Sequence, residues 1–175
     1  GQRFGDDPLA VLILAEVDVV LQSMRPGLLE SQGLAASRLR GLKESLIWCD
    51  LGAFGSGGPL SDKPGYDPLM QAFAGLMSVT GEEGRPPVRT GYSVVDQGTG
   101  MWAANAMLAA LFRRERTGKG CTVEVSLYET ALAWMGIAAA QYQSSGEVPA
   151  RHGSGAATIV PYRAFATSDG YLVVA

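Results

Sequence analysis

The chain has 175 residues, a hydrophobic content of 47% and a formal net charge of −3. This composition is typical of a globular domain with one ordinary core, and it lacks the basic stripe that collects nucleic-acid phosphates. No apolar run reaches the length of a membrane span, and no signal-peptide pattern is present. Cys49 and Cys121 lie in separate apolar runs and fit buried free thiols. We therefore expect a cytoplasmic protein that binds neither nucleic acid nor membrane.

Helical and strand-like segments alternate in the first half of the chain. A short helix is predicted from the start signal Asp6-Asp7-Pro8 to Ala15, and strands are predicted at 17–21 and 46–51. Short helical pieces ending near Lys43 separate the two strands. A glycine-rich loop at 52–58 leads to a helix predicted over 67–79. This order indicates an α/β sheet, although the glycine spacing does not match the dinucleotide fingerprint.

The second half opens with a strongly helical segment at 101–116, which is rich in Ala, Leu and Met and basic in its last turns. A strand at 121–126 and a long helix at 127–144 follow. In that helix four residues are expected to be packing residues: Trp134, Met135, Ile137 and Tyr142. A linker at 146–157 precedes a hairpin with strands at 162–167 and 171–175, turned by Asp169-Gly170.

The leading candidate for a catalytic side chain is Asp96. It lies in the stretch TGYSVVDQGTG, at or just before the N-terminus of the helix predicted at 101–116. Gly98 and Gly100 remove side-chain bulk beside it, so another molecule can approach the carboxylate closely. The helix macrodipole at this place is expected to lower the pKa of the carboxylate. The structural alternative is a helix N-cap, since Asp is a preferred residue there.

Short motifs follow one another from residue 17 to residue 175. They are VDVVL at 17–21, RPG at 25–27, GAFG at 52–55, PGYD at 64–67, GLMSVTG at 75–81, PPV at 86–88, Asp96 with TG at 99–100, RERTG at 114–118 and PYRAF at 161–165. In this order and spacing the chain resembles the family III CoA-transferases, which include formyl-CoA transferase and carnitine CoA-transferase.

The resemblance implies an α/β fold that contains part of a Rossmann-like large domain with parallel strands. Residues 1–126 would belong to that CoA-binding domain, residues 127–151 would form a connecting helix and loop, and residues 152–175 would start a smaller domain with a hairpin. The initial strands and a long C-terminal portion of the family are missing, so we expect a fragment of an interlocked-dimer fold, with a second copy of the chain as its partner.

In the family the acid that matches Asp96 is a nucleophile. The resemblance therefore implies that Asp96 carries CoA from an acyl-CoA to a small carboxylic acid through anhydride and aspartyl-CoA intermediates. Coenzyme A is then a substrate, and no cofactor is tightly bound. Backbone N–H groups of Gly98 and Gly100 are candidates for stabilising the oxyanion of each tetrahedral intermediate.

Two further segments are implied to bind CoA. Residues 23–25 match a family segment, usually Asn-Phe-Arg, that borders the thiol arm, and here they are Ser23, Met24 and Arg25. Residues 63–66 match a loop that contacts CoA or the active-site acid; they are Lys63, Pro64, Gly65 and Tyr66. Asp67 is a candidate orienting carboxylate in the same loop. A simple turn with a helix cap at Asp67 explains these residue types equally well.

Two other functions are alternatives to CoA transfer. The related α-methylacyl-CoA racemases carry a His where Tyr66 stands, and an unperturbed tyrosine, with a pKa of about 10, is a poor base at neutral pH. A non-catalytic CoA-binding or dimerising remnant is the second alternative, because Ser23, Met24 and Ser31 depart from the family pattern. One histidine, His152, and two distant cysteines do not make an ordinary zinc site, so no metal is expected.

Overall fold

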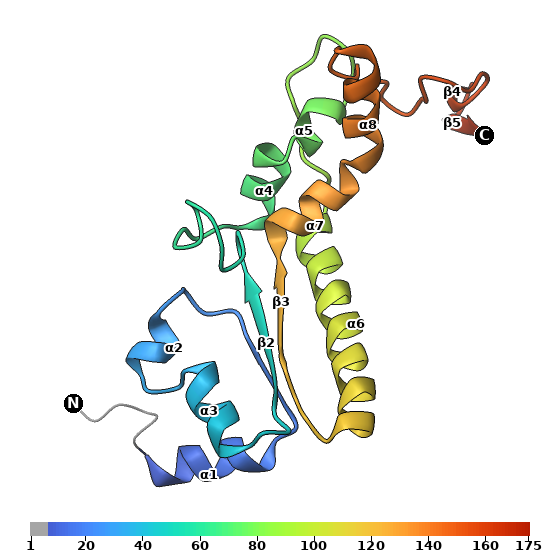
Figure 1. Cartoon of the computed structure of the whole chain (residues 1–175). Coiled ribbons are helices and arrows are strands. Elements are labelled where there is room, and N and C mark those ends of the chain that lie inside the picture. The colour runs from blue at the N-terminus through green and yellow to red at the C-terminus, as the bar shows by residue number, and fades with distance from the viewer. Residues whose placement is uncertain (1–6) are drawn as a thin grey trace.

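The computed structural model describes residues 7–175 and contains two sheets (Figure 1). The first is parallel, with strand order β1 (Val19–Gln22), β2 (Ile47–Gly52), β3 (Thr122–Ser126). The second is an antiparallel hairpin of β4 (Arg163–Ala166) and β5 (Tyr171–Val174). Each of the five predicted strands is therefore present within two residues of its expected bounds, and the α/β class with parallel strands is confirmed.

The helices precede the first strand or lie in the segments that connect the strands. Their bounds are α1 (Pro8–Glu16), α2 (Leu28–Ser31), α3 (Ala36–Leu42), α4 (Asp67–Phe73), α5 (Leu76–Val79), α6 (Val94–Thr117), α7 (Leu127–Trp134) and α8 (Gly136–Ser145). Asp6, part of the predicted start of the first helix, lies outside the described residues, as do the first residues of the segment 1–126. The division of the chain into the segments 1–126, 127–151 and 152–175 stays a prediction.

Two helices expected to be continuous are each broken. The helix predicted over 67–79 is interrupted at Gly75, whose φ of 94° is a conformation that favours glycine. The helix predicted over 127–144 is interrupted at Met135, which ends α7 and precedes α8. The expectation of four packing residues there is wrong for Ile137 and Tyr142, which are 79% and 52% exposed, whereas Trp134 is half exposed and packs against Gly98 of α6. Only Met135 packs against a core cluster.

Helices lie on both faces of the parallel sheet, with α2 and α3 on one side and α6 on the other (Figure 1). The apolar cluster under α2 and α3 is Leu34, Leu39, Leu46 and Trp48. A second cluster joins α4 to α7 at the other end of the sheet: Met70, Leu76, Val95, Leu127 and Ala131. Through Val95, the second cluster holds the N-terminal turn of α6 near the carboxyl ends of the strands.

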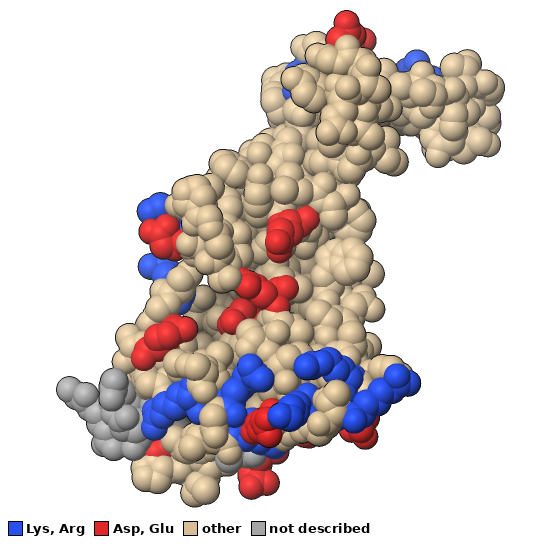
Figure 2. Space-filling model, in the orientation of Figure 1, with Lys and Arg blue, Asp and Glu red and all other residues tan. Residues whose placement is uncertain are grey.

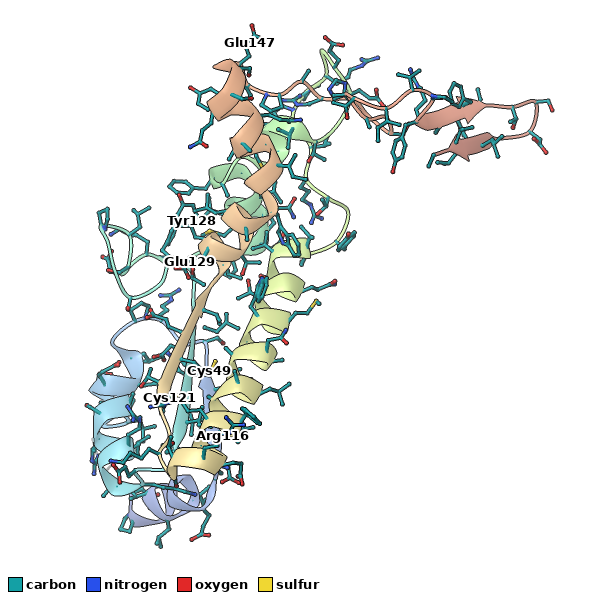
Figure 3. The ribbon with its side chains drawn as sticks, turned by 45° about the vertical axis from the view of Figure 1, so that its right-hand side comes forward. Cys49, Arg116, Cys121, Tyr128, Glu129 and Glu147 are labelled. Atoms are coloured by element: carbon teal, nitrogen blue, oxygen red, sulfur yellow. The ribbon has the colours of Figure 1, made fainter. Side chains whose placement is uncertain are left out.

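The start of α7 is fixed by Ser126, whose side chain caps the helix. Ser126 Oγ accepts from the backbone N–H of Glu129 at 3.1 Å and donates to Glu129 Oε2 at 2.9 Å. Figure 3 shows Tyr128 and Glu129 in this first turn, directly after β3. The same figure shows Cys49 on β2, and the Cys49 and Cys121 thiols are both free.

Basic side chains gather at the lower end of the molecule, where Figure 1 places α1, α3 and the C-terminal end of α6 (Figure 2). Several of them are held within the chain: Arg114 pairs with Asp18 at 2.9 Å, and Lys119 pairs with Glu44 at 2.8 Å. This band lies at the opposite end of the sheet from the site described below. Within residues 7–175, no helix is both long enough and apolar enough to cross a membrane.

Candidate active site

A cavity of about 220 Å³ opens at the carboxyl ends of the parallel strands. Ligands of open α/β sheets bind in this position, because the loops that follow parallel strands converge there. Its walls come from the loop after β1, the end of β2 with the loop that follows it, and the first turns of α6 and α7. The lining residues are Ser23, Met24, Arg25, Pro26, Leu51, Gly52, Ala53, Lys63, Pro64, Gly65, Tyr66, Asp96 and Leu127.

Asp96 lies inside the helix and not ahead of it. The helix begins at Val94, seven residues before the predicted start, so Asp96 belongs to the first turn of α6. Its side chain is exposed and lines the cavity. The capping alternative is wrong for this residue, because the backbone N–H of Val95 and that of Asp96 donate to Asp67 Oδ2 at 2.7 and 3.1 Å. The carboxylate of Asp96 is thus left free to face the cavity.

The pKa of Asp96 is raised above its ordinary value, chiefly by partial burial and also by the negative charge of Asp67. The expected lowering by the helix macrodipole is therefore wrong. The physical reason is first that burial disfavours the charged form of Asp96, and second that the carboxylate of Asp67, which accepts from the first amides of α6, repels it. A higher pKa makes the carboxylate a stronger nucleophile once it is ionised.

This pKa direction gives a first prediction. A folded-state pKa above the unfolded value means that ionised Asp96 destabilises the folded protein at pH values above the titration, and that this penalty disappears in acid. Asp96→Asn is therefore expected to raise the thermal unfolding midpoint at about pH 7 and to leave it nearly unchanged at about pH 3, where unperturbed Asp is largely protonated. Calorimetry at the two pH values measures the difference; an equal shift at both would contradict the prediction.

The loop after β1 is held by a chain of side chains on the sheet. Trp48 Nε1 and Gln22 Nε2 both donate to Asp50 Oδ1, at 2.7 and 2.6 Å. Gln22 Oε1 in turn accepts from the backbone N–H of Met24 at 2.7 Å. These contacts fix the backbone of residues 23–25 at the edge of the cavity.

The loop after β2 is anchored at two places. Ser56 donates to the Glu124 carboxylate through its backbone N–H and through Oγ, the latter at 2.8 Å. Gly65 lies against the core, and a Cβ there would stand 2.9 Å from the Ala53 Cβ and overlap the Met70 methyl group. A side chain at position 65 would therefore displace the wall that carries Lys63 and Tyr66.

The charges around Asp96 favour an anionic ligand on one side of the cavity. Arg25 and Lys63 line it, and Lys63 also pairs with Asp62 at 3.1 Å on the surface. A neighbouring cavity of similar size shares Met24, Pro26, Gly52 and Ala53 with the first but is lined by the acids Glu30, Asp50 and Glu124. Phosphates would be repelled from that second cavity.

Gly98 and Gly100 do not line the cavity. Gly98 is buried, and a Cβ there would lie 3.0 Å from Thr130 Cγ2 and 3.0 Å from Trp134 Cζ2, so this glycine lets α6 and α7 approach closely. Gly100 is exposed and meets nothing within 4 Å. Both glycines are inside α6 and not in a loop before it. Their contribution to oxyanion stabilisation stays a prediction.

All eight residues predicted as nucleophile or CoA-binding residues line this one cavity, although they come from three separate stretches of sequence. Five lining residues were missed: Pro26, Leu51, Gly52, Ala53 and Leu127. Their shared signal is position, since each lies at or just past the end of a predicted parallel strand or inside an adjoining motif. Within the described part of the chain, no group of three His, Cys, Asp or Glu residues is placed to hold a metal ion.

Comparison with known proteins finds relatives of the chain along nearly its whole length. Residues 5–175 match the family described as CoA-transferase family III. The chain is 37% identical over 172 residues to succinyl-CoA:glutarate CoA-transferase of Mus musculus, covering 96% of this chain and 39% of the relative. It is 32% identical over 171 residues to acetyl-CoA:oxalate CoA-transferase of Acetobacter aceti, covering 97% and 44%.

A solved structure gives the same result. The crystal structure of a CAIB/BAIF family protein from Brucella suis superposes with a TM-score of 0.89 at 35% identity, covering 95% of this chain and 44% of that one. The chain therefore spans about two fifths of the length of the relatives it matches.

Proposed function

Because the chain belongs to CoA-transferase family III, we propose that the cavity at Asp96 exchanges coenzyme A between an acyl-CoA thioester and a carboxylic acid. One observation carries the proposal: the exposed carboxylate of Asp96 lines the same cavity as Arg25, Lys63 and Tyr66. An aspartate that only capped its helix would turn toward the backbone amides of the first turn. In this chain Asp67 occupies those amides.

The proposed reaction consists of four acyl transfers. An Asp96 oxygen attacks the thioester carbonyl, the C–S bond breaks, and a mixed anhydride and the CoA thiolate result. The thiolate attacks the Asp96 carbonyl of the anhydride, which forms an aspartyl-CoA thioester and releases the donor carboxylate. An acceptor carboxylate then attacks this thioester, giving a second anhydride and the thiolate. Attack of the thiolate on the acceptor carbonyl forms the new acyl-CoA and regenerates Asp96.

The size of the cavity suits this chemistry at the reactive end of the substrate. A volume of about 220 Å³ is below the usual range for a whole drug-sized ligand, so it accommodates the thioester and a short acyl group while the remainder of CoA extends outside. Arg25 and Lys63 favour the approach of carboxylates and phosphates, and the acids of the neighbouring cavity disfavour it.

We propose short dicarboxylic acids as the acceptors to examine first. The two relatives compared above are named for transfer to glutarate and to oxalate. In this chain a cationic side chain beside Asp96 could pair with the carboxylate of the acceptor that does not react. Monocarboxylic acids of the same length are the natural comparison, since they lack that second charge.

The direct test is to trap the covalent intermediate. The protein is incubated with a short acyl-CoA, such as succinyl-CoA, and with hydroxylamine, and the peptide that contains Asp96 is analysed by mass spectrometry. A hydroxamate at Asp96 is the expected result, because hydroxylamine cleaves both an acyl anhydride and an aspartyl thioester. An unmodified Asp96 peptide in a protein that still binds acyl-CoA would instead favour the second candidate, a CoA-binding module without turnover.

Racemase chemistry remains a third candidate and has its own measurement. It would exchange the α-proton of a 2-methylacyl-CoA with deuterated solvent. Tyr66, 72% exposed at the cavity, stands where that chemistry needs a histidine, so no exchange is expected.

A further inference from the structure

Two buried polar side chains of α4 lie directly behind Asp96. Asp67 is 2% exposed and Gln71 is 0% exposed, and they are one helical turn apart. A carboxylate removed from water to this degree carries a large desolvation cost unless hydrogen bonds satisfy it. The hydrogen bonds of Asp67 join it to the segment that carries Asp96, two of them directly and one through Gln71.

The pair holds that segment at two places, at Val95 and Asp96 and at Thr90. Asp67 Oδ2 accepts from the amides of Val95 and Asp96, at 2.7 and 3.1 Å, and Asp67 Oδ1 accepts from Gln71 Nε2 at 2.5 Å. Gln71 Oε1 accepts from the backbone N–H of Thr90 at 2.9 Å. The carboxamide of Gln71 therefore joins the chain six residues before Asp96 to the carboxylate that holds Asp96 itself.

We propose that Asp67 and Gln71 form a positioning pair that fixes the backbone of Asp96, and so directs its carboxylate into the cavity for attack on the thioester. The inference rests on the proposed role of Asp96 as the nucleophile. The first amides of a helix have no partner within the helix, so an external carboxylate on two of them determines where the first turn begins. An error of about 1 Å in such a position can cost about 100-fold in rate.

The pair also has an electrostatic effect on Asp96. The titratable side chains that line the cavity with Asp96 are Arg25, Lys63 and Tyr66, and α7 contributes the apolar Leu127. Asp67 lies outside the cavity and accepts from the Asp96 amide. The charge of Asp67 raises the pKa of Asp96, after the larger contribution of burial. Removal of that charge should lower the pKa of Asp96 and weaken it as a nucleophile.

Asp67→Asn tests the charge while preserving the shape of the side chain. The rate of hydroxamate formation at saturating acyl-CoA should fall about 10- to 100-fold, with a half-saturating concentration changed by less than about twofold. The acidic limb of the pH–rate profile and the ¹³C titration of the Asp96 carboxyl should both move to lower pH. A residue with only a structural role would leave the titration of Asp96 where it is.

Gln71→Glu tests the hydrogen bond from Gln71 to Asp67, since it replaces the amide donor with an acceptor, and it adds negative charge where Asp67→Asn removes it. A similar loss of rate is expected, but the acidic limb should not move to lower pH because Asp67 keeps its charge. Gln141→Glu makes the same chemical change on the exposed face of α8 and should leave the rate unchanged. Unchanged rate and titration in both α4 variants would overturn the proposal.

If either α4 variant fails to fold, amide hydrogen exchange in the unaltered protein tests whether Asp67 holds the first turn of α6. The Val95 and Asp96 amides should be protected, and exchange at the rate of a free first-turn amide would overturn the proposal. The two levels of inference fail separately. CoA transfer that survives Asp96→Asn would reject Asp96 as the nucleophile, while the titration of Asp96 in the unaltered protein and in Asp67→Asn would still test the coupling between the two acids. Unchanged rate and titration in the α4 variants would reject only the positioning pair.

Discussion

Asp96→Asn is expected to lower the rate of CoA transfer by roughly 10⁴-fold or more, because covalent catalysis has no alternative route when its nucleophile is lost. The amide has nearly the shape of the carboxylate, so binding of acyl-CoA should persist. The measurement is transfer from succinyl-CoA to a panel of dicarboxylic acids, with binding followed separately by calorimetry. Loss of binding together with rate would indicate that the carboxylate holds the structure of the cavity and does not attack the substrate.

The control for this variant is Asp62→Asn. Asp62 is an exposed acid close to the same loop, but it does not line the cavity, and its contact is a surface ion pair with Lys63. Surface ion pairs of this type contribute little, so transfer should change by less than about twofold. Equal losses in Asp62→Asn and Asp96→Asn would show that general negative charge, and not one nucleophile, determines the rate.

Gly120→Ala is expected to destabilise the protein by about 2 to 4 kcal/mol, a large part of the stability of a typical domain. Gly120 is buried where the chain enters β3, and its N–H donates to the carbonyl oxygen of Glu44 at 2.9 Å. A Cβ there would stand 2.6 Å from the carbonyl oxygen of Ser45 and overlap the carbonyl group of Leu46. Backbone atoms cannot rotate away as a flexible side chain does.

Gly100→Ala is the matched control for that substitution. Gly100 lies in the exposed part of α6, and a Cβ there would meet nothing within 4 Å. Alanine should stabilise this helix by about 0.5 to 1 kcal/mol. Urea denaturation of both variants measures the two changes. A loss at Gly120 no larger than the change at Gly100 would mean that the turn at residues 44–46 moves freely to admit the methyl group.

Local pattern in the sequence was sufficient for the elements and for the chemistry of single residues. Apolar runs bounded by turn residues located all five strands, and the Ala- and Leu-rich segment located the body of α6. The family resemblance set Tyr66 where the racemases carry a histidine, and the type of side chain then disfavoured racemase chemistry without any structure. These signals are short-range: each depends on residues within one turn of helix or a few positions of strand.

Only the tertiary structure decided what depends on contacts between distant segments. The sequence did not predict that Asp67 caps a helix that begins 27 residues later, or that Gln71 joins Thr90 to it, since no periodic pattern marks a single hydrogen bond between loops and helices. It also missed the break at Gly75, where a positive φ favours glycine, and the break at Met135, which packs against a core cluster. The orientation of Asp96 toward the cavity depends on hydrogen bonds from distant residues, which are brought close only when the chain folds. The sequence could therefore identify the acid, but the tertiary structure determined its environment.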